Sequence, residues 1–148
     1  MSEGACRCGS VRLSAQGAPL TTMACHCTGC QRMTGGAYSL SSLYRAEKFR
    51  SEGPTSIGGI KGGTKHHFCR SCMSWLFTVP EGLDQFVNVR SSMFDDAAEH
   101  RPFADMWLSE ALPGSASGAP KQFDTVPGED EFGALVSEYA QWDRRVKQ

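Results

Sequence analysis

The sequence predicts a mainly β fold, α+β at most, that is stabilised by zinc and ends in one helix. Three observations predict it. Short alternating or β-branched runs, separated by glycine-rich turns, fill most of the chain before residue 110. Seven cysteines lie in three short groups, a pattern typical of metal ligands. One longer stretch with helical spacing comes last.

The first strand candidate, 8–15, alternates, with Val11, Leu13 and Ala15 on one face. Further strands are expected over 37–44, 65–69, 74–79 and 86–90. The glycine pairs at 58–59 and 62–63 predict turns between them.

A loop is expected at 113–120, because this segment consists of proline, glycine, serine and alanine. The helix is expected over about 129–146, where Phe132, Leu135 and Tyr139 recur near helical spacing. We interpret its apolar face as packing surface. The chain, 1–148, is expected to form a single domain whose core spans about 3–110.

Composition excludes several classes of protein. A hydrophobic content of 40% and a charged content of 21% suit a soluble globular protein. No apolar run approaches the ~20 residues that a spanning helix needs, so no membrane association is expected. The start of the chain, MSEG, has no hydrophobic block of a secretory signal, and we expect a cytoplasmic protein.

Charge is distributed unevenly along the chain. Residues 1–72 hold nine Lys or Arg against three Glu, whereas residues 73–148 hold six against thirteen acids. All seven cysteines lie in the basic half, where cations favour thiolates and could attract a small anionic substrate. The overall balance and the lack of a dense basic run predict no nucleic-acid partner.

The cysteines follow the spacings C-x-C, C-x-C-x-x-C and C-x-x-C; they are Cys6, Cys8, Cys25, Cys27, Cys30, Cys69 and Cys72. A disulfide framework is disfavoured by the odd number and by cysteines one residue apart, which rarely reach disulfide geometry. Buried free thiols would not gather into three short groups. The pattern therefore indicates metal binding, most simply two zinc ions.

The seven cysteines divide naturally into four and three. Cys6 and Cys8 with Cys69 and Cys72 would close a structural zinc site. The compact group Cys25, Cys27 and Cys30 would leave one coordination position open, as catalytic zinc sites do.

A histidine could instead complete the second site. The candidates are His26, His66 and His67. His26 lies between two predicted ligands, so in an extended segment its side chain would point away from the metal.

Three segments carry a resemblance to a known family. GACRCGSV at 4–11, CHCTGCQRMTG at 25–35 and FCRSC at 68–72 resemble the glutathione-dependent formaldehyde-activating enzymes, a family that includes the centromere protein V domain. The family usually has glycine directly after the last of these cysteines, where this chain has Met73.

The resemblance implies a β fold shared with small zinc-bound nucleotide-exchange-factor-like chaperones. It also implies the same division into Cys6, Cys8, Cys69 and Cys72 for a structural zinc and Cys25, Cys27 and Cys30 for a catalytic one. The implied activity is that of a carbon–sulfur lyase joining formaldehyde and glutathione into S-hydroxymethylglutathione.

The expected partners are thus a small thiol, with glutathione as a possible co-substrate, and an aldehyde; a homo-oligomer is possible. Residues that flank the motifs could bind carboxylates or move a proton; they are Arg32, Lys65, His66, His67 and Arg70. The alternative is a non-enzymatic zinc module that binds a protein partner.

Overall fold

The computed structural model describes residues 1–59 and 62–146. The strands are β1 (Ser2–Ala5), β2 (Arg12–Ala15), β3 (Thr21–Cys25), β4 (Ser39–Arg45), β5 (Phe49–Glu52), β6 (Thr55–Gly58), β7 (Lys65–Cys69), β8 (Trp75–Val79), β9 (Phe86–Arg90), β10 (Ala104–Met106) and β11 (Lys121–Gln122). The α-helices are α1 (Thr28–Thr34) and α2 (Glu129–Val146), and the short 3-10 helices are Ala46–Lys48, Ser91–Met93, Ala97–Glu99 and Leu108–Glu110. The predicted mainly β fold with a C-terminal helix is confirmed.

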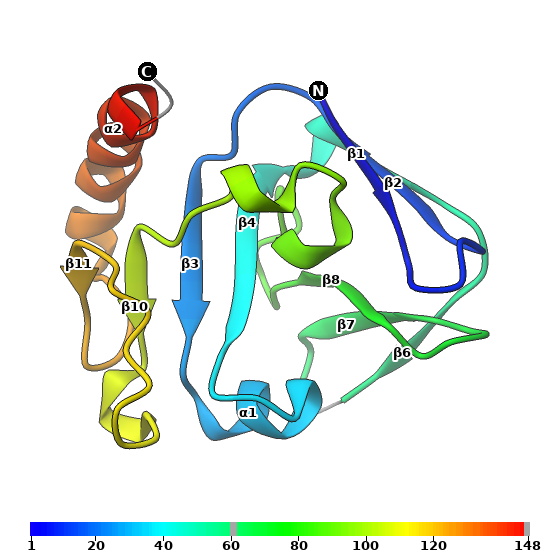
Figure 1. The fold of residues 1–148 in the computed structure, drawn as a ribbon, viewed down its shortest axis with the longest axis horizontal. Coiled ribbons are helices and arrows are strands. Elements are labelled where there is room, and N and C mark those ends of the chain that lie inside the picture. The colour runs from blue at the N-terminus through cyan, green and yellow to red at the C-terminus, as the bar shows by residue number, and fades with distance from the viewer. Residues whose placement is uncertain (60–61, 147–148) are drawn as a thin grey trace.

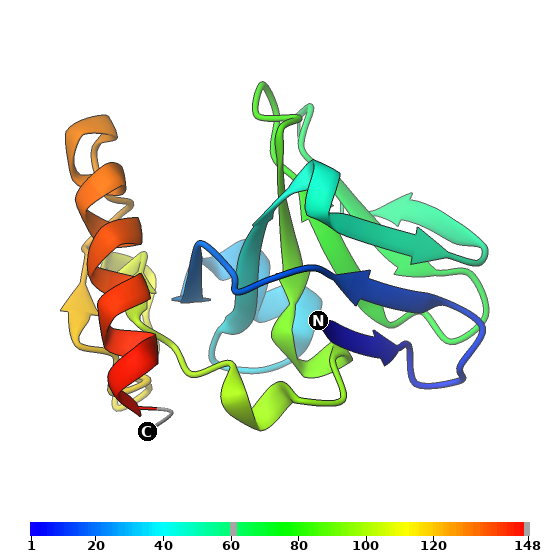
Figure 2. The same ribbon diagram turned by 90° about the horizontal axis from the view of Figure 1, so that it is seen from above.

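The strands form two sheets. The larger has the order β11-β10-β3-β4-β9-β8-β7-β6, and the smaller has the order β1-β2-β5. Figure 1 shows α2 at one side of the molecule and the small sheet at the opposite side. In the perpendicular view of Figure 2 these two elements again lie at opposite ends, with β3 and β4 of the large sheet between them.

Two hydrophobic clusters hold these parts together. One joins the small sheet to the large one and includes Val11, Leu13 and Tyr44. The other joins α2 to β3, β4 and β10 through residues such as Leu43 and Tyr139. Since Leu43 and Tyr44 are neighbours on β4, successive side chains supply the two clusters from opposite faces of the strand.

Several predicted elements agree with the structure. β7, β9 and α2 have the predicted bounds, and 113–120 contains neither helix nor strand. The strand predicted at 8–15 begins only at Arg12, because the preceding residues form the turn that presents Cys6 and Cys8. Val11, Leu13 and Ala15 are buried as predicted.

Within the described residues, no helix is long and apolar enough to cross a membrane.

Candidate metal centres

Two loops bring four cysteines together. Cys6 and Cys8 lie in the loop of the β1–β2 hairpin, and Cys69 and Cys72 lie at the turn between β7 and β8. All four sulfur atoms lie within 4.8 Å of one another. The Cys6–Cys8 and Cys8–Cys69 sulfur separations are 3.5 and 3.8 Å, close to the edge of about 3.8 Å expected of a tetrahedron with Zn–S bonds of about 2.3 Å.

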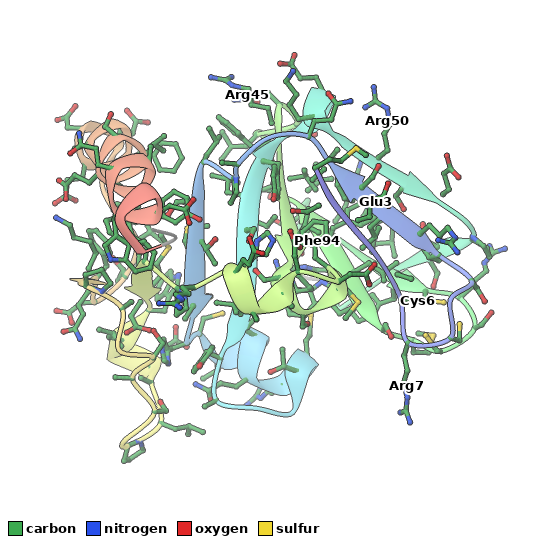
Figure 3. All side chains as sticks on the ribbon, turned by 45° about the horizontal axis from the view of Figure 1, so that its top comes forward. Glu3, Cys6, Arg7, Arg45, Arg50 and Phe94 are labelled. Carbon is green, nitrogen blue, oxygen red and sulfur yellow. The ribbon has the colours of Figure 1, made fainter. Side chains whose placement is uncertain are left out.

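Hydrogen-bond donors surround these sulfurs. The Val11 N–H donates to Cys6 Sγ at 3.3 Å, and the Ser74 hydroxyl lies 3.1 Å from Cys72 Sγ. The Ser74 hydroxyl, as the largest cause, lowers the pKa of Cys72 to about 5. Figure 3 shows Cys6 at the hairpin loop, with Arg7 pointing away from the molecule. This arrangement favours the thiolate at Cys6 and Cys72, two of the four ligands of the closed site.

The other three cysteines gather where β3 meets α1. Cys25 ends β3, Cys27 caps the N-terminus of α1, and Cys30 lies one turn into that helix. Their sulfur atoms lie within 4.8 Å of one another, and all three residues are partly buried. The Cys30 N–H donates to Cys27 Sγ at 3.4 Å, so the N-terminus of α1 stabilises a negative charge on the Cys27 sulfur.

Hydrogen bonds from neighbouring side chains hold the segment that carries this trio. His26 Nε2 lies 2.7 Å from Asp105 Oδ1, and both side chains are fully buried. Gln31 donates from Nε2 to the carbonyl oxygens of His26 and Glu110. The Thr28 hydroxyl donates to Glu110 Oε1 at 2.9 Å. These contacts fix the backbone that carries the three sulfurs.

None of the three candidate histidines joins the sulfur trio within the described residues. His26 bonds Asp105, His66 Nδ1 lies 2.9 Å from Thr78 Oγ1, and the His67 ring stacks on Phe77 at 4.4 Å between centroids. The trio therefore offers three sulfur ligands.

A cavity of about 170 Å³ opens at the trio. Its lining includes Cys25, Cys30, His66 and Arg90. Trp107 also lines it, with a left-handed φ of 58°, a conformation that is strained for a bulky residue.

Arg90 is a site residue that sequence reasoning missed. Its side chain is buried, and its guanidinium carbon lies 4.0 Å from the centre of the Trp75 ring. Burial lowers the pKa of Arg90 to about 10, so it remains a cation near neutral pH. No signal in the strand sequence FVNVR distinguishes Arg90 from an exposed arginine that ends a strand.

In the trio, contacts between the cysteines change the pKa of each thiol. The hydrogen bond with Cys25 lowers the pKa of Cys30 to about 6, whereas that same contact, followed by burial, raises the pKa of Cys25. Three thiolates in so small a volume need a cation among them. A zinc ion would leave one negative charge, which the Arg90 guanidinium offsets.

Of the five flanking residues singled out in the sequence, His66 is the one that lines this cavity within the described chain. Arg32, Lys65 and Arg70 are exposed. Burial, followed by the charge of Arg90, lowers the pKa of His66, so its imidazole is neutral at pH 7.

Both cysteine groups fit zinc by the softness of their sulfur donors and by their number, four in one and three in the other. The first set completes a tetrahedron, and the second leaves a position for another ligand.

Comparison with solved structures finds a Rhodobacter sphaeroides protein with a TM-score of 0.52 and 16% sequence identity. The match covers 82% of this chain and 98% of the other, which shows a shared fold. No curated protein matches the chain.

The family model of the glutathione-dependent formaldehyde-activating enzyme matches residues 1–110. The match includes all seven cysteines, His66 and Arg90. The chain belongs to the glutathione-dependent formaldehyde-activating enzyme family.

Proposed function

We propose that this protein is a zinc-dependent enzyme of the carbon–sulfur lyase type that acts on the adduct of a thiol and a small aldehyde. Glutathione and formaldehyde, giving S-hydroxymethylglutathione, are the first pair to test. The observation that carries the proposal is the cavity at Cys25 and Cys30, which joins sulfur ligands to a buried cation and a neutral histidine.

The polar atoms of the cavity support this proposal. Among the described residues, the buried Arg90 Nε and Asn88 Oδ1 have no hydrogen-bond partner. Buried polar groups are normally paired, so two unpaired ones at the same cavity suit a ligand that pairs them. An adduct bearing both a hydroxyl group and a sulfur atom meets that requirement.

Cys25, Cys27 and Cys30 would hold a zinc ion, which would supply an open coordination position and lower the pKa of a thiol bound there. His66 accepts the proton of the thiol, since its imidazole is neutral at pH 7. The thiol sulfur then bonds to the carbonyl carbon, and the C=O π pair moves to the oxygen. Arg90 stabilises that oxygen until His66 returns the proton, which yields the hydroxyl group of the adduct.

We further propose that the protein acts in the cytoplasm, since none of the seven cysteines forms a disulfide and a reducing compartment keeps thiols in that state. A small thiol and an aldehyde are the proposed partners.

The proposal is tested by following thiol–aldehyde exchange by NMR with zinc-loaded protein. The panel comprises glutathione, cysteine and 2-mercaptoethanol, each with formaldehyde and longer aldehydes. We expect exchange above the spontaneous rate for wild type and loss of that excess for Cys27→Ser.

The His66→Gln variant should keep its zinc and lose most of the excess rate. No excess rate for any pair, or equal rates for wild type and Cys27→Ser, would contradict the proposal and favour the non-enzymatic zinc module.

A further inference from the structure

A second and larger cavity, of about 470 Å³, lies between the large sheet and the start of α2. Its lining is mainly apolar and includes Met23, Leu43, Leu83, Phe86, Met106 and Phe132. Glu129 is the one charged residue of that lining among the described residues. The cavity therefore suits an uncharged, hydrophobic group.

This apolar cavity adjoins the cavity at the cysteine trio. Met23, Asn88, Met106 and Val126 line both. Asn88, whose buried Oδ1 has no hydrogen-bond partner, is the polar residue of this boundary among the described residues. Cys25 and Cys30 thus line the first cavity, three apolar residues and Asn88 form the boundary, and the second cavity is mainly apolar.

The rim of the apolar cavity exposes aliphatic surface to solvent. Leu83 is 46% exposed and Val126 is 52% exposed. These side chains, from different segments of the chain, border one opening. A ligand seated there would cover apolar surface that the fold leaves in water.

We propose that this cavity binds the alkyl chain of the aldehyde, and that the preferred substrates are linear aliphatic aldehydes longer than formaldehyde. The inference rests on the proposed function of the trio. Thiol addition forms the S–C bond, moves the C=O π pair to oxygen and transfers the thiol proton to that oxygen, as for formaldehyde. The alkyl chain then extends from the new carbon past Asn88 into the apolar cavity.

Chain length is the sharpest test, because burial of each methylene strengthens binding about fourfold. Zinc-loaded full chain is titrated with 1-butanol, 1-hexanol and 1-octanol, which lack a reactive group, and binding is followed by NMR. We expect the Kd to fall about fourfold per methylene and the methyl signals of Met23 and Met106 to shift. In parallel, kcat/KM should rise from formaldehyde to hexanal.

Two leucines of similar exposure provide matched variants. Leu83 borders the apolar cavity, whereas Leu112 is 49% exposed and does not line it. We expect Leu83→Asp to weaken 1-octanol binding at least tenfold and to leave the formaldehyde reaction unchanged. Leu112→Asp should bind 1-octanol as wild type does.

The outcomes separate this inference from the function on which it rests. Excess exchange with formaldehyde, together with alkanol affinity that does not depend on chain length, would overturn the inference alone. Equal loss of 1-octanol binding in both leucine variants would also overturn it. A chain-length trend in a protein that accelerates no thiol–aldehyde pair would overturn the proposed function and, with it, the assignment of the cavity to an aldehyde.

Discussion

At the scale of single residues, Met73 adopts a strained backbone conformation. It follows Cys72, is 60% exposed and has a left-handed φ of 58°. Its N–H donates to the Cys69 carbonyl at 3.0 Å, which closes the turn. The family resemblance implies a glycine at this position. Glycine adopts the left-handed region without steric cost, which explains that preference.

We therefore expect Met73→Gly to raise the free energy of unfolding by about 0.5–1 kcal/mol. Urea denaturation of the zinc-loaded protein measures the change. Met73→Ala is the matched control, since it removes the side chain but keeps Cβ, and it should give no comparable gain. Equal stability of the two variants would contradict the strain argument.

Arg90 supplies the second prediction at this scale. Because its buried guanidinium offsets the charge of the thiolate trio, Arg90→Gln should weaken zinc binding at Cys25, Cys27 and Cys30 by about tenfold or more. The zinc at the other four cysteines should stay bound.

Chelator competition, monitored as stepwise zinc release, measures both sites. Arg50→Gln, at an exposed position on β5, is the control and should match wild type. Unchanged release from both sites in Arg90→Gln would show that Arg90 does not stabilise the trio.

At the scale of elements, β1 is held by close backbone contact. A Cβ on Gly4 would lie 1.9 Å from the Met93 carbonyl oxygen and 2.7 Å from Phe94 Cα. Since these are backbone atoms, β1 would have to move, and Cys6 with it. We expect Gly4→Ala to lower the free energy of unfolding by about 1–3 kcal/mol and to loosen the four-cysteine site.

Gly133→Ala is the matched control for that prediction. Gly133 is exposed on α2, and a Cβ there meets nothing within 4 Å. Alanine in a helix interior should stabilise the protein by up to about 1 kcal/mol. Thermal unfolding should thus shift in opposite directions for the two variants, and a loss of stability in both would contradict the steric argument for Gly4.

The elements also show what the sequence could predict. The cysteine groups, β7, β9 and α2 were recognisable because spacing and periodicity are local signals. β3 was missed, since Thr21–Ala24 is buried throughout and shows no alternation. The seven-residue α1 was missed because it is too short to show a periodic pattern. Arg90 and Asp105 reach the site only through the pairing of distant strands, which local pattern does not encode.

At the scale of the whole molecule, alkaline pH tests the docking of α2 on the sheet. Tyr139 is buried, and its hydroxyl lies 3.2 Å from Thr22 Oγ1 on β3. Burial raises the pKa of Tyr139 to about 12. The folded state thus favours the neutral phenol, and this contribution is complete below pH 10 and is lost as pH rises from about 10 to 12.

We expect wild type to lose up to about 2–3 kcal/mol of stability over that range relative to Tyr139→Phe. Urea denaturation of both proteins between pH 8 and 12 measures the difference, and tyrosinate absorbance gives the ionisation directly. A difference in stability that stays constant with pH would contradict burial of the neutral hydroxyl.

The central claim for the molecule is that its seven cysteines hold two zinc ions, one in a closed site and one with an open position. X-ray absorption at the zinc edge, with and without an added small thiol, tests it most directly. The claim predicts two ions per chain with seven sulfur ligands in all, and one lighter ligand that sulfur replaces when the thiol is added. A histidine ligand that persists after thiol addition, or only one bound zinc, would contradict it.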